Sequence, residues 1–437
     1  MSMRVAGCTR IAVVPAALNS PGPGWTGTEW TGHVAGSATY RRIVVALMAG
    51  GLANFSLMYF VQPLLPLLAA HYGVSAGESA HALSATTLGI ILGLVVAGPL
   101  ADRVGRVPVM RWSLLASGTL GLVAAVAPNW TSLVAVRGLL GLTLAGLPVA
   151  ALAYLREEVD TASHPRANAT YIAGTAMGGA VGRLLPGPLA VLGGWQLAAI
   201  VLSLVTLAAG VALVVLLPPA RGFHPHAVGL RHVLLGTLGA ARDRVVLLLC
   251  VAGFTTMGAF VGIYNAIGFR LASPPLLLGA SAALVYLAYP IGIAAPGLIR
   301  RLSERIGRGL ASVAAMALLA IAVVVVSLPS LGAVVIGLGL LTFAFLGAHS
   351  LLSGWAVDRA RRTGIGTAQA SSAYLSTYYL GSTIAGALAT WQWQAGGWAG
   401  VEALALLLTA AALVVTGLAT AADRNPKVAH DEAAVLD

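Results

Sequence analysis

The sequence predicts an all-α membrane protein with twelve transmembrane helices in two pseudo-symmetric halves of six. Three observations predict this fold class. The 437 residues are 58% hydrophobic and only 9% charged, the apolar residues form runs long enough to cross a bilayer, and short motifs recur about two hundred residues apart. Soluble domains are about 25% charged, so a chain this apolar is not a soluble enzyme, a disordered chain or a secreted disulfide scaffold.

Apolar runs of about 17–25 residues, the length that a helix needs to cross lipid, occur repeatedly along the chain. In chain order the predicted helices are 43–70, 81–101, 109–128, 132–155, 167–192, 196–217, 245–269, 280–299, 309–328, 332–356, 368–393 and 399–421. No run alternates strictly between apolar and polar residues, and an open sheet cannot cross lipid with its edge amides unpaired. The runs therefore predict helices and not the strands of a membrane barrel.

The segments outside these runs divide the chain. Residues 1–40 are rich in Gly, Pro, Ser and Thr and are predicted to be a disordered tail, although a start codon assigned too early accounts for them equally well. Residues 41–217 and 245–421 form the two six-helix halves. Residues 218–244 link the halves on the cytoplasmic side, either as a short surface helix or as a plain linker, and residues 422–437 form a second tail.

The basic side chains indicate how the chain is inserted. Almost all arginines between the predicted helices lie in gaps on the side of both termini, whereas the opposite side has Arg270. Because positively charged loops stay in the cytoplasm, both termini are predicted to be cytoplasmic in a multi-pass protein of the inner membrane. No basic patch with interleaved aromatic residues indicates a nucleic-acid partner, so the net charge of +11 is attributed to membrane insertion.

The chain contains a weak internal repeat. Residues 102–106 read DRVGR after the second predicted helix, and residues 304–308 read ERIGR after the eighth, at an offset of 202 residues. The motif GGW ends the fifth predicted helix at 193–195 and the eleventh at 396–398, at an offset of 203. Two parallel six-helix repeats place a site near the membrane midplane between them, which is the architecture of a transporter.

The loop after the second predicted helix reads GPLADRVGR over residues 98–106 and resembles the loop signature of the major facilitator superfamily. Arg137 and Gly141 resemble a second signature of that family, in the fourth helix, and the resemblance covers roughly residues 41–421. It implies a gate on the cytoplasmic side and, through Arg137, a role in proton coupling. The gating and coupling residues on this interpretation are Gly98, Asp102, Arg103, Gly105, Arg106, Arg137 and Gly141.

The side chains of this loop suggest how such a gate works. Gly98 leaves room for another helix to pack closely, and Gly105 supplies a turn conformation that other residues avoid. Asp102 is expected to contact the start of the eleventh helix around Thr367 and to hold the cytoplasmic side closed. The alternative is a solvated turn. The second copy, with Glu304, lacks the leading glycine and is predicted to be only a turn.

The fifth predicted helix resembles an antiporter signature in part. Gly174 and the pair Gly187 and Pro188 match, but Arg183 stands where a glycine is expected. The resemblance favours export over uptake. The alternative is that the glycines of this helix only permit close helix packing.

Two arginines lie deep in the predicted helices of the amino-terminal half, where charge is costly. Arg137 and Arg183 lie at similar depth on adjacent helices, with no acid at that level. Either they extend separately toward water, or something anionic neutralises them. A proton-coupled carrier also needs a titrating group, for which the candidates are Asp102, Glu402 and His349, and histidine titrates near neutral pH.

Polar and aromatic side chains recur on helices that would line a central cavity in this fold. In the first helix they precede Pro63 and Pro66, which break a helix where a substrate could reach backbone groups. Tyrosine presents a ring and one hydroxyl, which suits an amphipathic organic solute better than a sugar. The predicted substrate-binding residues are Asn54, Tyr59, Gln62, Arg183, Thr256, Tyr264, Asn265, Tyr286, Tyr289, Tyr374 and Tyr378.

These features predict a secondary active transporter that exports a small amphipathic organic compound by rocker-switch exchange against protons. One alternative is uptake of a small anionic solute, which Arg137 and Arg183 favour. An alternative of another class is a membrane-embedded enzyme or a solute sensor. The expected partners are a small-molecule substrate, protons and the lipid bilayer, and the protein is expected to be a monomer. No cofactor or metal is expected, because the sequence has no phosphate-binding G-x-x-x-x-G-K-[ST] stretch and no His/Cys/Asp cluster at metal-ligand spacing.

Overall fold

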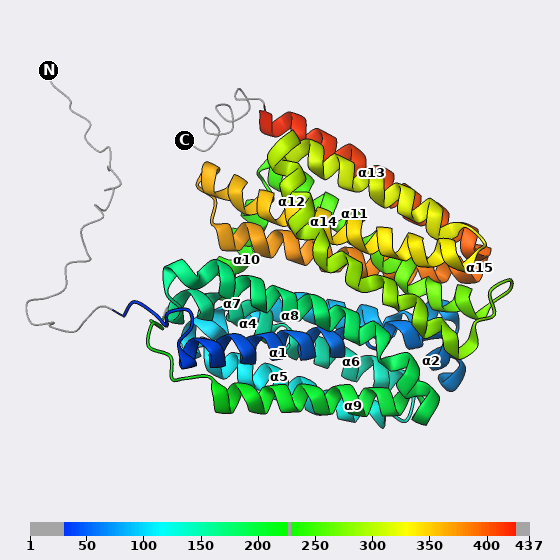
Figure 1. Cartoon of the computed structure of the whole chain (residues 1–437), viewed down its shortest axis with the longest axis horizontal. Helices are drawn as coiled ribbons and strands as arrows, with labels where there is room; N and C mark the ends of the chain where they lie inside the picture. Colours follow the sequence, from blue (N-terminus) through cyan, green and yellow to red (C-terminus); the bar gives the residue numbers. More distant parts are fainter. Residues whose placement is uncertain (1–29, 226–228, 425–437) are drawn as a thin grey trace, which may run out of the picture.

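A computed structural model describes residues 30–225 and 229–424, and these residues form two helical bundles that lie side by side. The amino-terminal half, blue to green in Figure 1, forms one layer, and the carboxy-terminal half, green to red, forms the other. Within the described residues the only strand-like pairing is an isolated bridge between His33 and Val159. Helices pair their interior backbone groups within one segment, as lipid requires, and the predicted all-α fold class is confirmed.

The long helices of the amino-terminal half are interrupted at prolines. Its helices are α1 Ala38–Tyr59, η1 Gln62–Leu64, α2 Leu65–Tyr72, α3 Ala76–Ser79, α4 His81–Val104, α5 Arg106–Ala125, α6 Trp130–Leu144, α7 Gly146–Glu158, η2 Thr161–Ser163, α8 His164–Leu184 and α9 Pro186–Leu216. Pro63 has no amide hydrogen to continue the helical ladder, so α1 ends and the chain passes through η1 into α2. Pro186 similarly separates α9 from α8.

The carboxy-terminal half repeats this arrangement. Its helices are α11 Arg244–Ala272, η3 Gly279–Ala294, α12 Ala295–Ile306, α13 Arg308–Ser327, α14 Leu331–Thr363 and α15 Thr367–Arg424. Pro290 lies inside η3 and Pro296 lies in the first turn of α12. The eighth predicted span is therefore a 3-10 segment that continues as an α-helix.

Ten helical segments of the described chain are long and apolar enough to cross a membrane. The more polar α8 adds a crossing of 21 residues. The 58-residue α15 would measure about 87 Å if straight, nearly three times the hydrocarbon thickness of a bilayer. It breaks at Gly397, where φ is 63°, and α9 breaks in the same way at Gly193 and Gly194. The ten segments, with α15 counted as two, and α8, whose predicted span ends in the part of α9 before Gly193, together match the twelve predicted crossings.

The helix ends differ from the predicted ones. The first span begins at Ala38, whereas 43 was predicted, and α14 continues to Thr363, whereas 356 was predicted. The helices continue past the apolar runs into charged residues, and those near the end of α14 form ion pairs. Residues 30–37, expected to be disordered, precede α1 and pair with the loop after α7, where the His33 amide donates to the Glu158 carbonyl.

The predicted linker contains a helix, α10 Leu230–Ala240, which packs against α4 and α15 and lies between the two halves (Figure 1). Both ends of the described chain lie at this same end of the bundle (Figure 1). We call it the charged end, because the ion pairs of Arg106, Arg308 and Arg359 lie there, and we call the opposite end the far end. Most of the two predicted tails, at 1–29 and 425–437, lies outside the described residues.

Glycines set the closest helix contacts. A Cβ atom at Gly178 of α8 would overlap the Leu52 carbonyl of α1, and Gly174 and Gly182, one turn away on either side, are equally close to α1. Small residues four apart let two backbones approach in the membrane. Close packing is therefore an established role of the fifth-span glycines.

Candidate functional site

Hydrogen bonds between the two halves gather toward the far end. The Gly77 amide donates to the Gln394 side chain at 3.3 Å, and the Ser84 hydroxyl donates to the Thr383 carbonyl at 2.9 Å. The hydroxyls of Thr87 and Thr383 lie 2.7 Å apart. These contacts join α4 and its preceding turn to α15, so the halves are closed against each other at the far end. Nothing in the sequence pattern distinguishes these small side chains from others in the spans.

A chain of polar side chains crosses from one half to the other. Arg183 Nε donates to Gln62 Oε1 at 2.7 Å, Gln62 Nε2 donates to Asn265 Oδ1 at 2.7 Å, and Asn265 Nδ2 donates to the Gly386 carbonyl at 3.2 Å. Gln62 and Asn265 are 203 residues apart, which is the offset of the repeat. Each is separated by 121 residues from its other partner. The chain is therefore pseudo-symmetric, with Gly386 in the place that Arg183 takes in the amino-terminal half.

Aromatic rings surround the Arg183 guanidinium. Its Cζ lies 4.0 Å from the ring centre of Tyr59, 4.7 Å from Tyr289, 5.1 Å from Tyr264 and 5.8 Å from Phe260. The Tyr59 ring comes from the amino-terminal half and the other three from the carboxy-terminal half. Arg183 is fully buried, so the predicted outward extension toward water is wrong for this residue. We call this group the Arg183 cage.

The cage continues into further aromatic side chains of the carboxy-terminal half. Phe260 stacks on Phe345 with ring centres 3.9 Å apart, and Phe345 in turn packs against Tyr378. The Tyr378 ring lies 4.5 Å from that of half-buried His349, whose Nδ1 lies 3.1 Å from the Tyr374 hydroxyl. Sequence reasoning missed Phe260 and Phe345, because an apolar aromatic residue in a span looks like any core residue.

Arg137 has a different environment. Its Nε donates to the Ala82 carbonyl at 3.1 Å, and its two terminal nitrogens donate to the carbonyls of Leu57 at 3.1 Å and Met58 at 2.8 Å. The latter two carbonyls lie in the last turn of α1, where no later amide completes the helical ladder. A cation there also offsets the negative end of the helix dipole. Arg137 is fully buried and its partners in the described part of the chain are neutral carbonyls, so both predicted alternatives, extension toward water and an anionic partner, are wrong for it there.

Three predicted substrate-binding residues lie away from the polar chain. Thr256 donates to the Ala252 carbonyl and to Met316 Sδ within the carboxy-terminal half. Asn54 is buried in α1, and its Oδ1 has no hydrogen-bond partner among the described residues. The Tyr286 ring packs 6.0 Å from that of Tyr264, on the edge of the cage. The remaining predicted residues belong to the polar chain, the Arg183 cage or its aromatic continuation.

The signature loop makes its contacts within one half. Asp102 pairs with Arg106, and Arg106 Nε lies 3.1 Å from Glu157 Oε1. The contact expected between Asp102 and Thr367 is not present among the described residues. Gly105 has a φ of 100°, as its predicted turn role requires.

Two other residues of the loop also differ in their surroundings from what was expected. No described atom lies within 4 Å of a Cβ at Gly98, so the expected close helix contact there is wrong for this conformation. Arg103 is exposed. In this conformation the loop therefore stabilises the charged end of its own half.

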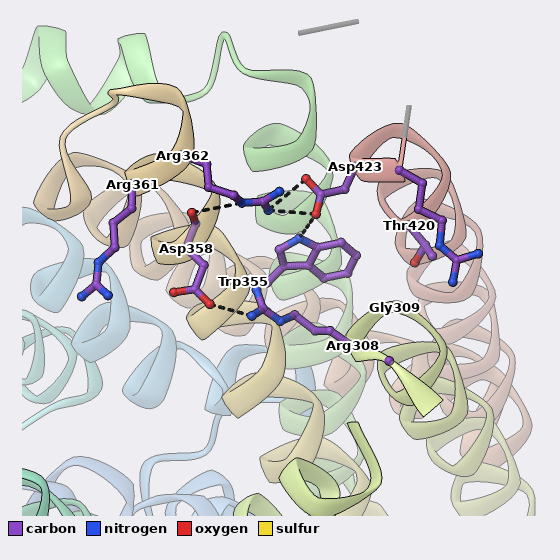
Figure 2. Close-up of a pocket in the computed structure, with 10 residues that line it drawn as sticks. Arg308, Gly309, Trp355, Asp358, Arg361, Arg362, Thr420 and Asp423 are labelled. Carbon is purple, nitrogen blue, oxygen red and sulfur yellow. Dashed lines mark hydrogen bonds and ion pairs between the residues drawn. The ribbon is translucent and has the colours of Figure 1, made fainter. Parts of the chain in front are cut away.

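A charged cluster in the carboxy-terminal half corresponds to this loop. Figure 2 shows Arg308 pointing to Asp358, at 2.6 Å, and Arg362 pointing to Asp423, at 2.9 Å, with the Trp355 indole also donating to Asp423. The pair of Arg308 and Asp358 repeats that of Arg106 and Glu157 at the same place in its half. Sequence reasoning missed these acids, although their repeat offset was a signal.

A pocket of about 600 Å³ lies beside this cluster (Figure 2). Its lining comes from α13, α14 and α15 with the glycine that precedes α13, all of the carboxy-terminal half. A site that is exposed alternately to the two sides of a membrane needs both halves, so we assign the candidate substrate site to the Arg183 cage and not to this pocket. No group of three or more metal-ligating side chains occurs among residues 30–225 and 229–424.

Comparison with known proteins agrees with this architecture. The sequence model described as Major Facilitator Superfamily matches residues 47–373. The chain is 35% identical over 385 residues to the inner membrane transport protein YnfM of Escherichia coli (strain K12), covering 88% of this chain and 92% of that protein. It is 32% identical over 383 residues to the MFS-type transporter YybF of Bacillus subtilis (strain 168), covering 87% and 94%.

Among solved structures, the fold is similar to a bacterial homolog of the human lysosomal transporter Spinster. The TM-score is 0.68 at 13% sequence identity, and the match covers 90% of this chain and 99% of that one. At this identity the likeness concerns the fold alone.

Proposed function

Because this chain belongs to the major facilitator superfamily, it is a multi-pass membrane protein that transports a small molecule, and we propose that it exports a small amphipathic organic compound in exchange for protons. The observation that carries this proposal is the Arg183 cage, where a polar chain and tyrosine rings from both halves meet. Tyrosine offers an apolar face and one hydroxyl, which suits an amphipathic solute. The family and its relatives are transporters, so the enzyme alternative falls away.

The contacts at the far end support alternating access. For the site to open there, the bonds of Thr383 with Ser84 and Thr87 and the bond between Gln62 and Asn265 must break. The charged end would then close, with both halves rocking about the site. The positive-inside rule supports a cytoplasmic position for the charged end and both termini, in the inner membrane. We take the monomer as the transporting unit, because the candidate site lies between two halves of one chain.

The proton is assigned to His349. Acidic side chains of the described spans, such as Asp102, Asp358 and Glu402, lie near helix ends, whereas His349 lies mid-helix beside the aromatic continuation of the cage. Imidazole can accept and release a proton at a ring nitrogen. Its Nδ1 lies 3.1 Å from the Tyr374 hydroxyl, which can accept a hydrogen bond from the protonated ring or donate one to the neutral ring.

We expect His349→Asn to abolish uphill transport driven by a pH gradient while leaving solute exchange at equal pH within about twofold of wild type, because only the coupled step needs the proton. Transport into proteoliposomes, with and without a pH gradient, measures both. His81→Asn, at an exposed histidine of the far end, is the matched control. Full pH-driven accumulation by His349→Asn would contradict the assignment.

We expect Asp102→Asn to slow transport about tenfold without loss of membrane insertion, because Arg106 keeps its pair with Glu157 while the gate loses a charge. The matched control is Glu304→Gln at the equivalent place of the second copy, where the exposed pair with Arg300 spans 3.6 Å. Initial rates per inserted protein test this. Equal rates for the two variants would remove Asp102 from the gate.

The direction of transport is the remaining choice within this function. Uptake of a small anionic solute would use the same two halves in reverse. Counterflow of dyes, antibiotics and organic anions in proteoliposomes, under an imposed pH gradient of either sign, distinguishes the two directions. A transport rate that is the same under every pH gradient and with or without ionophores would exclude proton exchange.

A further inference from the structure

We propose that the transported compound is an organic anion with a planar apolar body, whose carboxylate binds the guanidinium of Arg183 while its ring packs on the tyrosines of the cage. This inference rests on the proposed transport function and specifies the substrate class for the same site. It follows from the one guanidinium nitrogen of Arg183 that has no acceptor among the described residues, from the repeat, and from the rings around it.

The guanidinium of Arg183 lacks partners that a buried cation needs. Nε donates to Gln62 and Nη1 donates to the Gly179 carbonyl at 2.9 Å, but Nη2 has no acceptor among the described residues. The groups that it contacts are neutral. The ring faces offset part of its charge, yet a buried cation without a counter-ion stays costly. A carboxylate supplies both the missing acceptor and the missing charge.

The other buried arginines do not share this deficit. Arg137 uses all three of its nitrogens on backbone carbonyls. Arg270, at the end of α11, donates to the carbonyls of Val326, Ser327 and Leu328. Both arginines cap a helix end that the fold leaves open, so the partners of each are carbonyl groups of the fold itself.

The repeat shows that the fold does not require an arginine at this place. The equivalent of Arg183 in the carboxy-terminal half is Gly386, whose backbone carbonyl accepts from Asn265. The same helix crossing is thus built in the second half without a cation. The asymmetry leaves one positive charge at the junction of the halves, which is what recognition of a single anionic group needs.

The surrounding rings define the rest of the solute. Tyrosine rings of α1, α11 and η3 enclose the guanidinium on several sides. A flat apolar body attached to the carboxylate would pack against these rings in the way that they now pack against one another. Tyr59, Tyr289 and Tyr378 keep 5–8% of their surface exposed, whereas Arg183 keeps none. A solute therefore meets the tyrosines first. An organic cation would meet the buried guanidinium as a like charge, which disfavours it.

The test compares three matched probes on the full chain in proteoliposomes: 2-naphthoate, its neutral amide, and 2-naphthylmethylamine. We expect exchange of the carboxylate at least about tenfold faster than that of either other probe, with half-saturation at a lower concentration. Arg183→Gln should reduce carboxylate exchange at least about tenfold, and Arg183→Lys should lie between, because lysine keeps the charge but not the two-pronged geometry. Arg166→Gln, at an exposed arginine near the start of α8, is the control.

The wild-type comparison needs no variant to fold, so it decides the charge preference by itself. Equal or faster exchange of the amine or amide would overturn the anion proposal while leaving a proton-driven exporter standing. Full carboxylate exchange by Arg183→Gln would overturn the role of Arg183. Absence of exchange for every probe and for the wider counterflow panel would overturn the proposed function, and this inference with it.

Discussion

We expect Arg137→Met to lower the free energy of unfolding by on the order of 3–6 kcal/mol, because it leaves the carbonyls of Leu57 and Met58 without donors and removes one donor from that of Ala82, in a setting where water cannot replace it. Two of these carbonyls belong to the last turn of α1 and the third to the first turn of α4. The guanidinium therefore ties two helices together beside the helix break. Loss of this side chain should loosen the contact between α1 and α4 next to Gln62. Transport activity should therefore fall together with stability.

Thermal unfolding of the purified protein in detergent measures the effect. Arg166→Met removes the same side chain from an exposed position and should unfold within a few degrees of wild type. Arg137→Lys should recover part of the loss, since one ammonium reaches fewer carbonyls than the fork does. If Arg137→Met unfolded at the same temperature as Arg166→Met, the capping role would be wrong and a coupling role for Arg137 would gain support.

We expect Gly141→Ala to destabilise the protein by about 3 kcal/mol, the upper end of the range for an overpacked interior. A Cβ atom there would overlap the Thr86 carbonyl oxygen, and the neighbouring atoms that would have to move are backbone atoms of α4. Neither helix can shift without disturbing Arg137, which lies one turn earlier on α6 and also bonds α4.

Gly138→Ala is the matched control on the same helix. A Cβ at Gly138 would lie 3.8 Å from the Ala85 carbonyl oxygen, an ordinary contact, so this variant should keep wild-type stability or gain a few tenths of a kcal/mol. Melting temperatures and the yield of monodisperse protein compare the pair. Equal behaviour of the two alanine variants would mean that α6 does not pack on α4 as closely as described.

Much of the candidate site was predictable from residue type and span alone. Gln62, Asn265 and the tyrosines were selected because polar and amphipathic side chains are costly in lipid unless they face something polar. Their pairing was not predictable, although Gln62 and Asn265 stand at the offset of the repeat. A sequence pattern places a residue on a helix and at a depth, but the facing helix is set by packing far along the chain.

The two arginines of the amino-terminal half show the same limit. Arg137 and Arg183 looked equivalent in the sequence, buried at one level with no acid nearby. The structure separates them, because the partners of Arg137 are backbone carbonyls at a helix break, whereas one nitrogen of Arg183 has no partner in the described chain. Carbonyl groups are the same in every residue, so no residue type marks the ones that a helix leaves unpaired.

The sequence by itself determined the membrane environment, the helical class, the twelve crossings and the duplication. Hydropathy is an average over neighbouring residues, and the repeat is a spacing between motifs, so both can be read directly along the chain. Only the tertiary structure decided which end is closed, which arginine stabilises the fold and which one faces the junction of the halves. Those outcomes depend on hydrogen-bond partners far apart in the sequence, such as Arg137 with Leu57 or Gln62 with Asn265, which meet only when the helices pack.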